Sequence, residues 1–253
     1  GKIDNCQLGV FLAYASVAGR ALIDRELYLP NSWTEDAERR ADARIGQDVV
    51  FATKPALAKA MLQRAVAAGV PFRWVCGDEV YGDNPALRSW LTGQRLAYVL
   101  AIGYKHRLGP RGQNARTLAA ILPEDVWEIR SAGDGAHGLR EYAWAQVSLP
   151  DREAADGFST ALLIRRHPTT GERAYYLVHA PLGTPLAEIV RAAGGRWAIE
   201  ECFQAAKNEA GLDHCQARHY RAWYRHITLA LAAAAHLTAL RVSTGQKGEA
   251  TTT

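Results

Sequence analysis

Cysteine is scarce in this sequence, and the cysteines present form no recognisable framework. The chain of 253 residues has four, at Cys6, Cys76, Cys202 and Cys215, with no CxxC pair and no tight cluster. Neither a disulfide scaffold nor a cysteine zinc site is therefore expected. A reducing cytoplasm is the expected location.

The chain also lacks the usual signals for export or membrane insertion. No basic segment followed by an apolar segment opens it, so no signal peptide is expected. The longest run rich in Ala and Leu, residues 227–240, is interrupted by His236 and is too short to span a bilayer, so it predicts a buried core helix. The single methionine is Met61 and the first residue is Gly1, so we expect the chain to be a fragment without its translation start.

Charge of one sign is not strongly in excess. Thirty Lys and Arg against 26 Asp and Glu give a net charge of +4, a weak bias toward polyanions that many unrelated proteins share. Hydrophobic residues make up 48% and charged residues 22%, which excludes disorder for the bulk of the chain. The length predicts one large domain, or a domain with an insertion, around a sizeable core.

The first part of the sequence alternates strand and helix patterns. Two apolar runs within residues 7–30, split by a short Ala-Gly-Arg segment, predict a hairpin. Residues 53–69 predict a helix opened by a threonine cap, and residues 84–93 a second helix opened by an asparagine cap. Strand patterns at 72–78 and 95–102 flank the second helix. This α/β pattern predicts a sheet with crossover helices.

The second part changes character. Helical periodicity fades after Tyr104, and short apolar runs around the turn at 168–171 predict antiparallel strands. Helical patterns then return, with one helix ending at Gly211 and a last one over about 221–242. The predicted division is a core segment 1–103, a β-rich insertion 104–181, a helical core segment 182–242 and a disordered tail 243–253.

The first candidate for chemistry is Asp78, which follows a predicted strand. Open α/β sheets place functional groups at the carboxyl ends of their strands. A helix-capping or loop role for this aspartate is about equally expected. Glu79 and Asp83 are weaker candidates in the same segment.

The second candidate is the helical segment around Glu200. Arg196, Glu200 and Lys207 are spaced by four and seven residues, so the pattern places them along one helical face. The alternative is a solvated surface with ordinary ion pairs.

Beyond these patterns, the segment RWAIEECFQAAKNEAGLD resembles the R-x3-E-x6-K signature of DDE-class insertion-sequence transposases of the insertion-sequence-four superfamily. The segments GKIDNCQLGVFLAYAS, LYLPNSWTEDAERR, FATKPALAKAMLQRAVAAGVPFRWVCGDEVYGD and YRAWYRHITLALAAAAHL resemble its seven-oh-one branch. The resemblance implies a ribonuclease-H-like α/β fold, a mixed sheet with flanking helices. Two aspartates and a glutamate in that fold bind two divalent metal ions.

The resemblance also implies roles for single residues. Asp78 corresponds to the second aspartate and Glu200 to the glutamate, both as catalytic metal ligands for Mg²⁺, with Mn²⁺ as a substitute. Carboxylate oxygens are the ligands that Mg²⁺ prefers. Arg196 and Lys207 would hold a DNA phosphate. The implied partners are double-stranded DNA with the terminal inverted repeats of a mobile element and a second copy of the chain, in the bacterial nucleoid, with no membrane and no small-molecule substrate.

Two departures from the family pattern matter. A tyrosine expected three residues before Arg196 is replaced by Ala193. The first aspartate lies in an Asp-Asp-Thr segment on the first strand, which in the family precedes the segment that begins with Gly1. Asp4 and Asp24 belong to later segments and do not replace it. We therefore expect the first strand to be missing and this chain to be inactive alone.

Further DNA contacts are expected in the β-rich insertion. Trp127 or Trp144 would supply an aromatic platform for a flipped base, with packing between strands as the alternative. Lys105 and Arg107 begin a stretch with four Lys or Arg and no acid, which would track a phosphate backbone or form a solvated loop. The histidines match no common zinc spacing, and His226 is expected to be packed or hydrogen-bonded at the last helix.

Three functions remain open from the sequence. The first is a transposase catalytic core that cleaves and joins DNA at element ends. The second is a catalytically inactive, truncated transposase that binds DNA or inhibits the complete enzyme. The third is a nuclease or resolvase on the same fold, which would need the carboxylates but not Arg196 and Lys207.

Overall fold

The computed structural model describes residues 6–108, 112–135, 138–149 and 157–249. The chain forms two compact units. The first unit combines residues 1–70 with 197–253, and the second consists of residues 71–196. Each unit is described by itself.

The first unit is built on a β-hairpin. Strand β1 (Leu8–Ala15) pairs antiparallel with β2 (Arg20–Tyr28), with a register shift between Leu12 and Ala13. The turn is closed by a hydrogen bond from the Ser16 N–H to the Gly19 carbonyl at 2.8 Å. The predicted hairpin is confirmed.

Five helices in the described part of this unit accompany the hairpin: α1 (Asn31–Thr34), α2 (Ala37–Asp42), α3 (Lys54–Ala67), α8 (Ala198–Ala210) and α9 (Tyr220–Glu249). Helix α3 begins as predicted, because the Thr53 side chain accepts a hydrogen bond from the Ala56 N–H at 3.3 Å. Helix α8 ends at Gly211, whose φ of 63° is the left-handed conformation that favours glycine.

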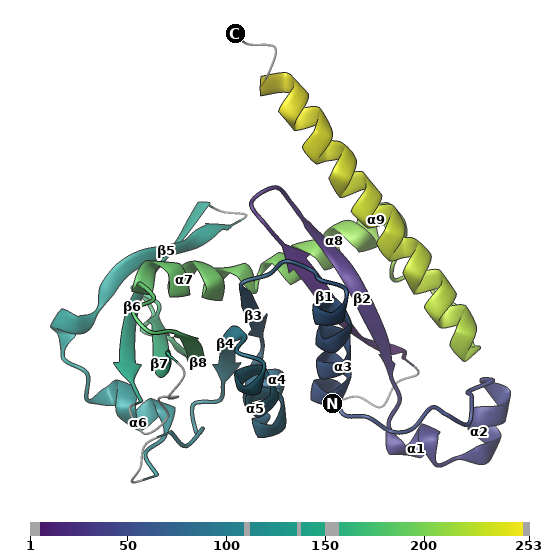
Figure 1. Ribbon diagram of the computed structural model, residues 1–253, viewed down its shortest axis with the longest axis horizontal. Coiled ribbons are helices and arrows are strands. Elements are labelled where there is room, and N and C mark those ends of the chain that lie inside the picture. The colour runs from purple at the N-terminus through teal and green to yellow at the C-terminus, as the bar shows by residue number, and fades with distance from the viewer. Residues whose placement is uncertain (1–5, 109–111, 136–137, 150–156, 250–253) are drawn as a thin grey trace. The chain divides into compact units, whose positions relative to one another are not determined.

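The core of the first unit lies where α8 and α9 pack on the hairpin (Figure 1). Buried side chains from all three meet there, including Leu22 of β2, Cys202 of α8, and Trp223 and Ile227 of α9. Apolar burial of this kind is the main stabilising contribution available to the unit.

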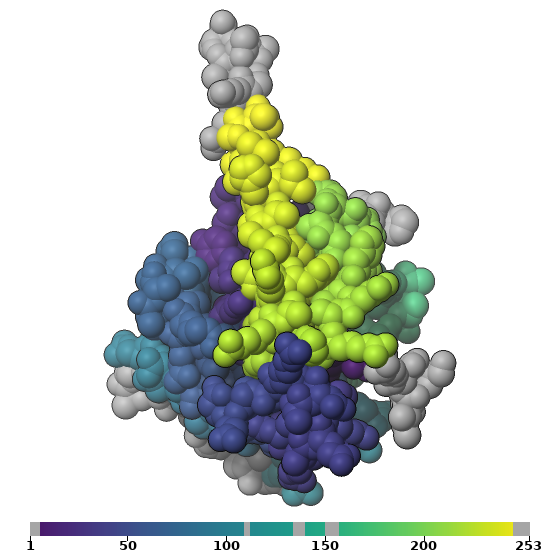
Figure 2. All heavy atoms as spheres, turned by 90° about the vertical axis from the view of Figure 1, so that its right-hand side faces the viewer, coloured from purple at the N-terminus to yellow at the C-terminus, as the bar shows by residue number. Residues whose placement is uncertain are grey.

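Helix α9 differs from its prediction in length and in burial. It continues to Glu249, whereas the sequence predicted its end at Val242 and a disordered tail from residue 243. The most apolar stretch of 18 residues within Tyr220–Thr244 has a mean hydropathy of 1.3, and 17% of it is buried, so the prediction of a buried core helix is wrong. By length and composition alone this segment is long and apolar enough to cross a membrane, although one such helix is weak evidence. Figure 2 shows the surface along which α9 is exposed.

The second unit is built on one six-stranded sheet. Its strands are β3 (Trp74–Gly77), β4 (Ala97–Ile102), β5 (Glu128–Gly135), β6 (Gly138–Ser148), β7 (Phe158–Arg166) and β8 (Arg173–Pro181). Their order is β3-β4-β8-β7-β6-β5. Strands β3 and β4 are parallel, and every other neighbouring pair is antiparallel. The predicted mixed α/β class is confirmed.

Short helices accompany this sheet: α4 (Glu79–Gly82), α5 (Pro85–Gly93), α6 (Ala115–Ala120), a 3₁₀ turn (Glu124–Val126) and α7 (Leu186–Gly195). Helix α7 contacts β3, β4 and β5. Fully buried side chains of the central strands form the core, among them Trp144, Leu162, Leu163, Ile164 and Leu177. The arrangement of sheet and helices is compatible with a ribonuclease-H-like fold.

The predicted antiparallel strands around the turn at 168–171 are confirmed as β7 and β8. Strand β8 also pairs with β4, so the strands within 104–181 continue the sheet that begins with β3 and β4 (Figure 1). The insertion boundaries stay a prediction.

Candidate functional site

Asp78 lies where the sequence predicted it, directly after a short strand. Its side chain caps α4, because Oδ1 accepts a hydrogen bond from the Val80 N–H at 2.9 Å. The residue is exposed. Capping engages one carboxylate oxygen and leaves the group open to solvent, so the capping and functional roles of Asp78 are compatible.

A second acid and a histidine meet at the same edge of the sheet. Gly77 of β3 pairs in register with Leu100 of the parallel strand β4, so the segments that follow both strands leave from one edge. Asp83 accepts hydrogen bonds from the Gly103 N–H, with both oxygens at 3.3 Å. The His106 Nδ1 lies 2.6 Å from Asp83 Oδ1, and it must be the donor because a carboxylate only accepts.

Sequence reasoning ranked Asp83 low and did not pair it with His106. The two residues are 23 positions apart, and only the parallel pairing of β3 with β4 brings them together. The usable signal was that residues following two neighbouring parallel strands share a sheet edge.

Arg196 is not on the same helix as Glu200, which corrects the sequence interpretation. Helix α7 ends at Gly195 with Arg196 as its C-cap, and α8 begins at Ala198 after Trp197. The glycine pair before Arg196 favours this break, because glycine costs helix stability.

The charge of Arg196 acts near the end of β3. Burial raises the pKa of the Cys76 thiol to about 12, while the positive charge of Arg196 opposes this rise. The Cys76 thiol also donates to the Ala192 carbonyl at 3.1 Å. This thiol is therefore protonated and unreactive at neutral pH.

Glu200 and Lys207 lie on α8, which belongs to the first unit. Both are exposed, Glu200 in the first turn of the helix and Lys207 in the last. Seven residues separate them, so they share a helical face. Lys207 also suits the negative end of the helix dipole. Because Asp78 belongs to the second unit, its convergence with Glu200 stays a prediction.

The two candidate tryptophans lie in different surroundings. Trp144 on β6 is fully buried, and its Nε1–H donates to the Arg130 carbonyl at 3.2 Å. Stacking of a base on Trp144 would require the surrounding strands to separate. Trp127 is half-buried, with the guanidinium carbons of Arg166 and Arg173 at 4.1 and 5.7 Å from its ring centroid. A base would compete with these arginines, so the stacking role of Trp127 stays a prediction.

Lys105 and Arg107 are exposed and lie in the segment that leaves β4. The Lys105 ammonium lies 5.5 Å from the ring centroid of Tyr104. Arg107 forms an isolated β-bridge with Asn114. These two cations therefore project from an organised segment.

No three His, Cys, Asp or Glu side chains among the described residues are grouped so as to hold a metal ion. The Nε2 atom of His226 on α9 lies 3.0 Å from the Gly211 carbonyl oxygen, which agrees with the predicted hydrogen-bonded position of this histidine. The exposed carboxylate of Asp78 offers oxygen ligands, the type that hard divalent cations prefer.

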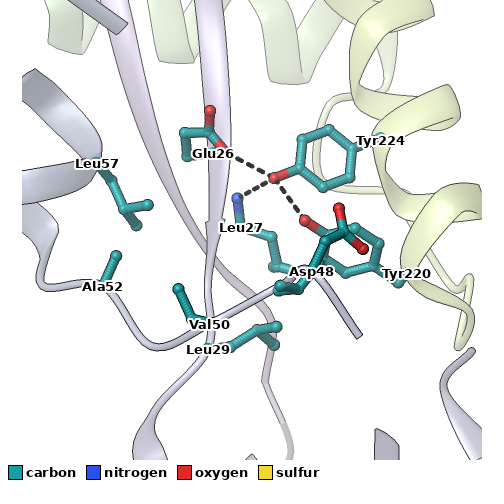
Figure 3. A pocket seen from close by; sticks show the side chains of 10 residues that line it. Glu26, Leu27, Leu29, Asp48, Val50, Ala52, Leu57, Tyr220 and Tyr224 are labelled. Carbon is teal, nitrogen blue, oxygen red and sulfur yellow. Dashed lines mark hydrogen bonds between the residues drawn. The ribbon is translucent and has the colours of Figure 1, made fainter. Parts of the chain in front are cut away.

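A separate pocket in the first unit was not anticipated. It encloses about 230 Å³ between the 48–52 segment and the start of α9 (Figure 3). Tyr224 donates from its hydroxyl to Glu26 at 2.8 Å and accepts from the Leu27 N–H at 3.2 Å. Burial raises the pKa of Tyr224 well above its ordinary value. The hydroxyl is thus a structural hydrogen-bonding group that stays protonated.

The geometry therefore defines a mixed α/β protein with an exposed aspartate at the carboxyl edge of two parallel strands. The sequence profile of the DDE superfamily endonuclease family matches residues 1–120. No curated protein matches the chain. The family match supports a DDE-class, transposase-like domain and indicates an activity of nuclease or transposase type on DNA. Endonucleases of this type generally use divalent metal ions.

Proposed function

We propose that the chain is the catalytic core of a DNA transposase of the insertion-sequence-four superfamily, seven-oh-one branch. The observation that carries this proposal is the exposed Asp78 at the carboxyl end of β3, within the 1–120 segment that matches DDE superfamily endonucleases. Its reaction would be metal-dependent cleavage and strand transfer of DNA at the ends of a mobile element.

Asp78 and Glu200 would hold the metal ions, Mg²⁺ or Mn²⁺. When bound, such ions activate the attacking oxygen and stabilise the leaving one. Arg196 and Lys207 would bind a phosphate of the scissile strand and orient it. The family resemblance implies a third carboxylate beside these two.

We propose that this carboxylate is the first aspartate of the family, on a strand upstream of Gly1. In the part of the chain that the structure describes, β1 pairs only with β2 and β3 pairs only with β4. Each strand therefore has a second edge to which another strand could add. Without that strand, we expect the 253-residue chain to bind metal weakly and to leave DNA uncut.

A second function would follow if the chain acts without a first aspartate. A chain that binds element ends, or pairs with the complete enzyme, without cleaving would act as an inhibitor. A nuclease or resolvase on the same fold would keep its activity when Arg196 and Lys207 are replaced, which distinguishes it from the transposase.

The experiment compares the 253-residue chain with a version extended upstream by an Asp-Asp-Thr strand, on duplexes carrying the element end, with Mg²⁺ or Mn²⁺. We expect the extended chain to nick the duplex and the 253-residue chain to leave it intact. Asp78→Ala or Glu200→Ala should abolish its nicking, because each removes a metal ligand. Glu201→Ala, next to Glu200 on α8, is the matched control and should cut normally. Nicking by the shorter chain that depends on Asp78 would contradict the proposed position of the first carboxylate.

A further inference from the structure

A basic segment leaves the sheet at the edge that carries Asp78. No Asp or Glu occurs from residue 84 to residue 123, while six Lys and Arg do. Three of these cations, Lys105, Arg107 and Arg116, are exposed on residues 104–108 and 112–116, which we call the basic loop. A segment of this charge attracts phosphate groups without acids of its own to neutralise it.

The basic loop has a defined backbone. Its two arms are joined by hydrogen bonds from the Leu108 N–H to the Gln113 carbonyl, from the Ala115 N–H to the His106 carbonyl, and from the Arg116 N–H to the Tyr104 carbonyl, all between 2.9 and 3.1 Å. Leu108 and Ala115, one on each arm, are buried. The exposed cations therefore project from an ordered support.

One contact ties this support to the segment that contains Asp78. The Asp83 carboxylate accepts from the Gly103 N–H and from His106 Nδ1–H, and so binds both the start of the loop and its first arm. Asp83 is in turn the C-cap of α4, the helix that Asp78 opens. The His106 side chain is 13% exposed, whereas that of Asp83 is 45% exposed.

An aspartate is an unfavourable residue on a surface that binds phosphate, unless it has another task. Glu79 lies at the same edge, since its Oε2 is 3.9 Å from where a Cβ on Gly103 would lie. Asp83 differs from Glu79 in that its carboxylate makes three hydrogen-bonding contacts to the base of the loop. Holding the basic loop in position explains why an aspartate occurs at position 83 on this surface.

We propose that Asp83 and His106 are positioning residues for DNA binding. They hold the basic loop so that Lys105, Arg107 and Arg116 contact phosphates of duplex DNA beside Asp78. The proposal rests on the proposed function and adds the residues that orient the DNA phosphate backbone.

The test measures binding of a duplex of about 25 base pairs to the 253-residue chain in EDTA, at about 50 to 300 mM salt. Each of the three cations replaced by Ala should lower the salt slope by about 0.9, because one fewer counterion is released. The direction in which Asp83→Ala changes the affinity for DNA decides between the two explanations. Removal of an acid from a DNA-binding surface normally strengthens binding, whereas loss of the tie should weaken it and lower the slope.

Matched variants separate positioning from charge and from folding. His106→Leu should weaken binding as Asp83→Ala does, and His106→Asn should restore it, because asparagine places an N–H donor near the position of Nδ1. In the His106→Leu background, Arg107→Ala should have little further effect. Asp125→Ala, which removes an exposed acid from another segment, should leave binding unchanged or slightly tighter. Circular dichroism and urea midpoints show which variants are folded.

Three results would overturn the inference. If Asp83→Ala tightens binding while Arg107→Ala weakens it, the cations act without the tie. If the three cation variants bind like the unaltered chain, the basic loop is not the DNA surface. Both results leave metal-dependent nicking, and so the proposed function, intact. If the unaltered chain binds no duplex at the lowest salt concentration, the inference and the proposed DNA substrate fail together.

Discussion

At the scale of single residues, two glycines are required by the close approach of neighbouring backbone. A Cβ on Gly82 would lie 1.7 Å from the Ala101 carbonyl oxygen, and one on Gly194 would lie 2.1 Å from that of Ala132. Neither glycine has a positive φ. Glycine is needed at both positions because it has no side chain, so α4 can pack closely against β4 and α7 against β5.

The glycine pair in α7 offers a matched test. Gly194→Ala should lower the free energy of unfolding by about 3 kcal/mol, because backbone must shift to admit the methyl group. Gly195→Ala is the control, since a Cβ there would meet no atom within 4 Å beyond its own stretch of helix. It should be neutral or stabilising by up to about 1 kcal/mol. Urea unfolding of both variants measures this, and equal losses would contradict the argument.

At the scale of elements, local signals in the sequence located most helices and strands. Asn84 and Thr53 cap helices where the sequence predicted, because capping depends on bonds to N–H groups three residues away. The end of α9 was misplaced because the polar residues after Val242 carry no proline, and the two glycines among them did not end the helix. Strands β5 and β6 were not predicted individually, since their pairing is set by partners rather than by their own pattern.

The cap of α5 gives a prediction at this scale. The Asn84 side chain accepts a hydrogen bond from the Leu87 N–H at 2.8 Å, and Pro85 occupies the first turn. Asn84→Ala should destabilise the second unit by about 1 kcal/mol, whereas Asn84→Asp should retain the cap. Thermal unfolding of the two variants decides it. Equal melting temperatures for the alanine variant and the unaltered chain would show that the cap is not needed.

At the scale of the whole molecule, the candidate catalytic residues come from segments far apart in sequence. The first unit is formed by both ends of the chain and contains Glu200, while the second contains Asp78 and the basic loop. The sequence pattern marked Asp78 and Glu200 as candidates, and the family resemblance implied their roles as metal ligands, which stay a prediction. The contact of Asp83 with His106 was not predictable from spacing, because it depends on the pairing of two strands.

The proposed function requires Asp78 and Glu200 to converge. Metal ions in two-metal sites lie about 4 Å apart, so carboxylates that bind them should lie within about 10 Å of each other. The test is a chain with Asp78→Cys and Glu200→Cys, in which Cys6 and Cys215 are replaced by Ser, treated with a bismaleimide that spans about this distance. Cys76 and Cys202 remain, because burial raises the pKa of both thiols.

We expect an intramolecular cross-link between positions 78 and 200, identified by mass spectrometry of tryptic peptides. The control pairs Asp78→Cys with Asn208→Cys, which is exposed on the same helix. Eight residues along α8 displace that thiol by about 12 Å, beyond the reach of the reagent if position 200 is the near one. Efficient linking at 200 with little at 208 therefore places the first turn of α8 beside the end of β3. Equal yields at both positions would show that the two units collide without a fixed arrangement, which would contradict a stable convergence. Linking at 208 alone would show that Glu200 is not part of the metal site.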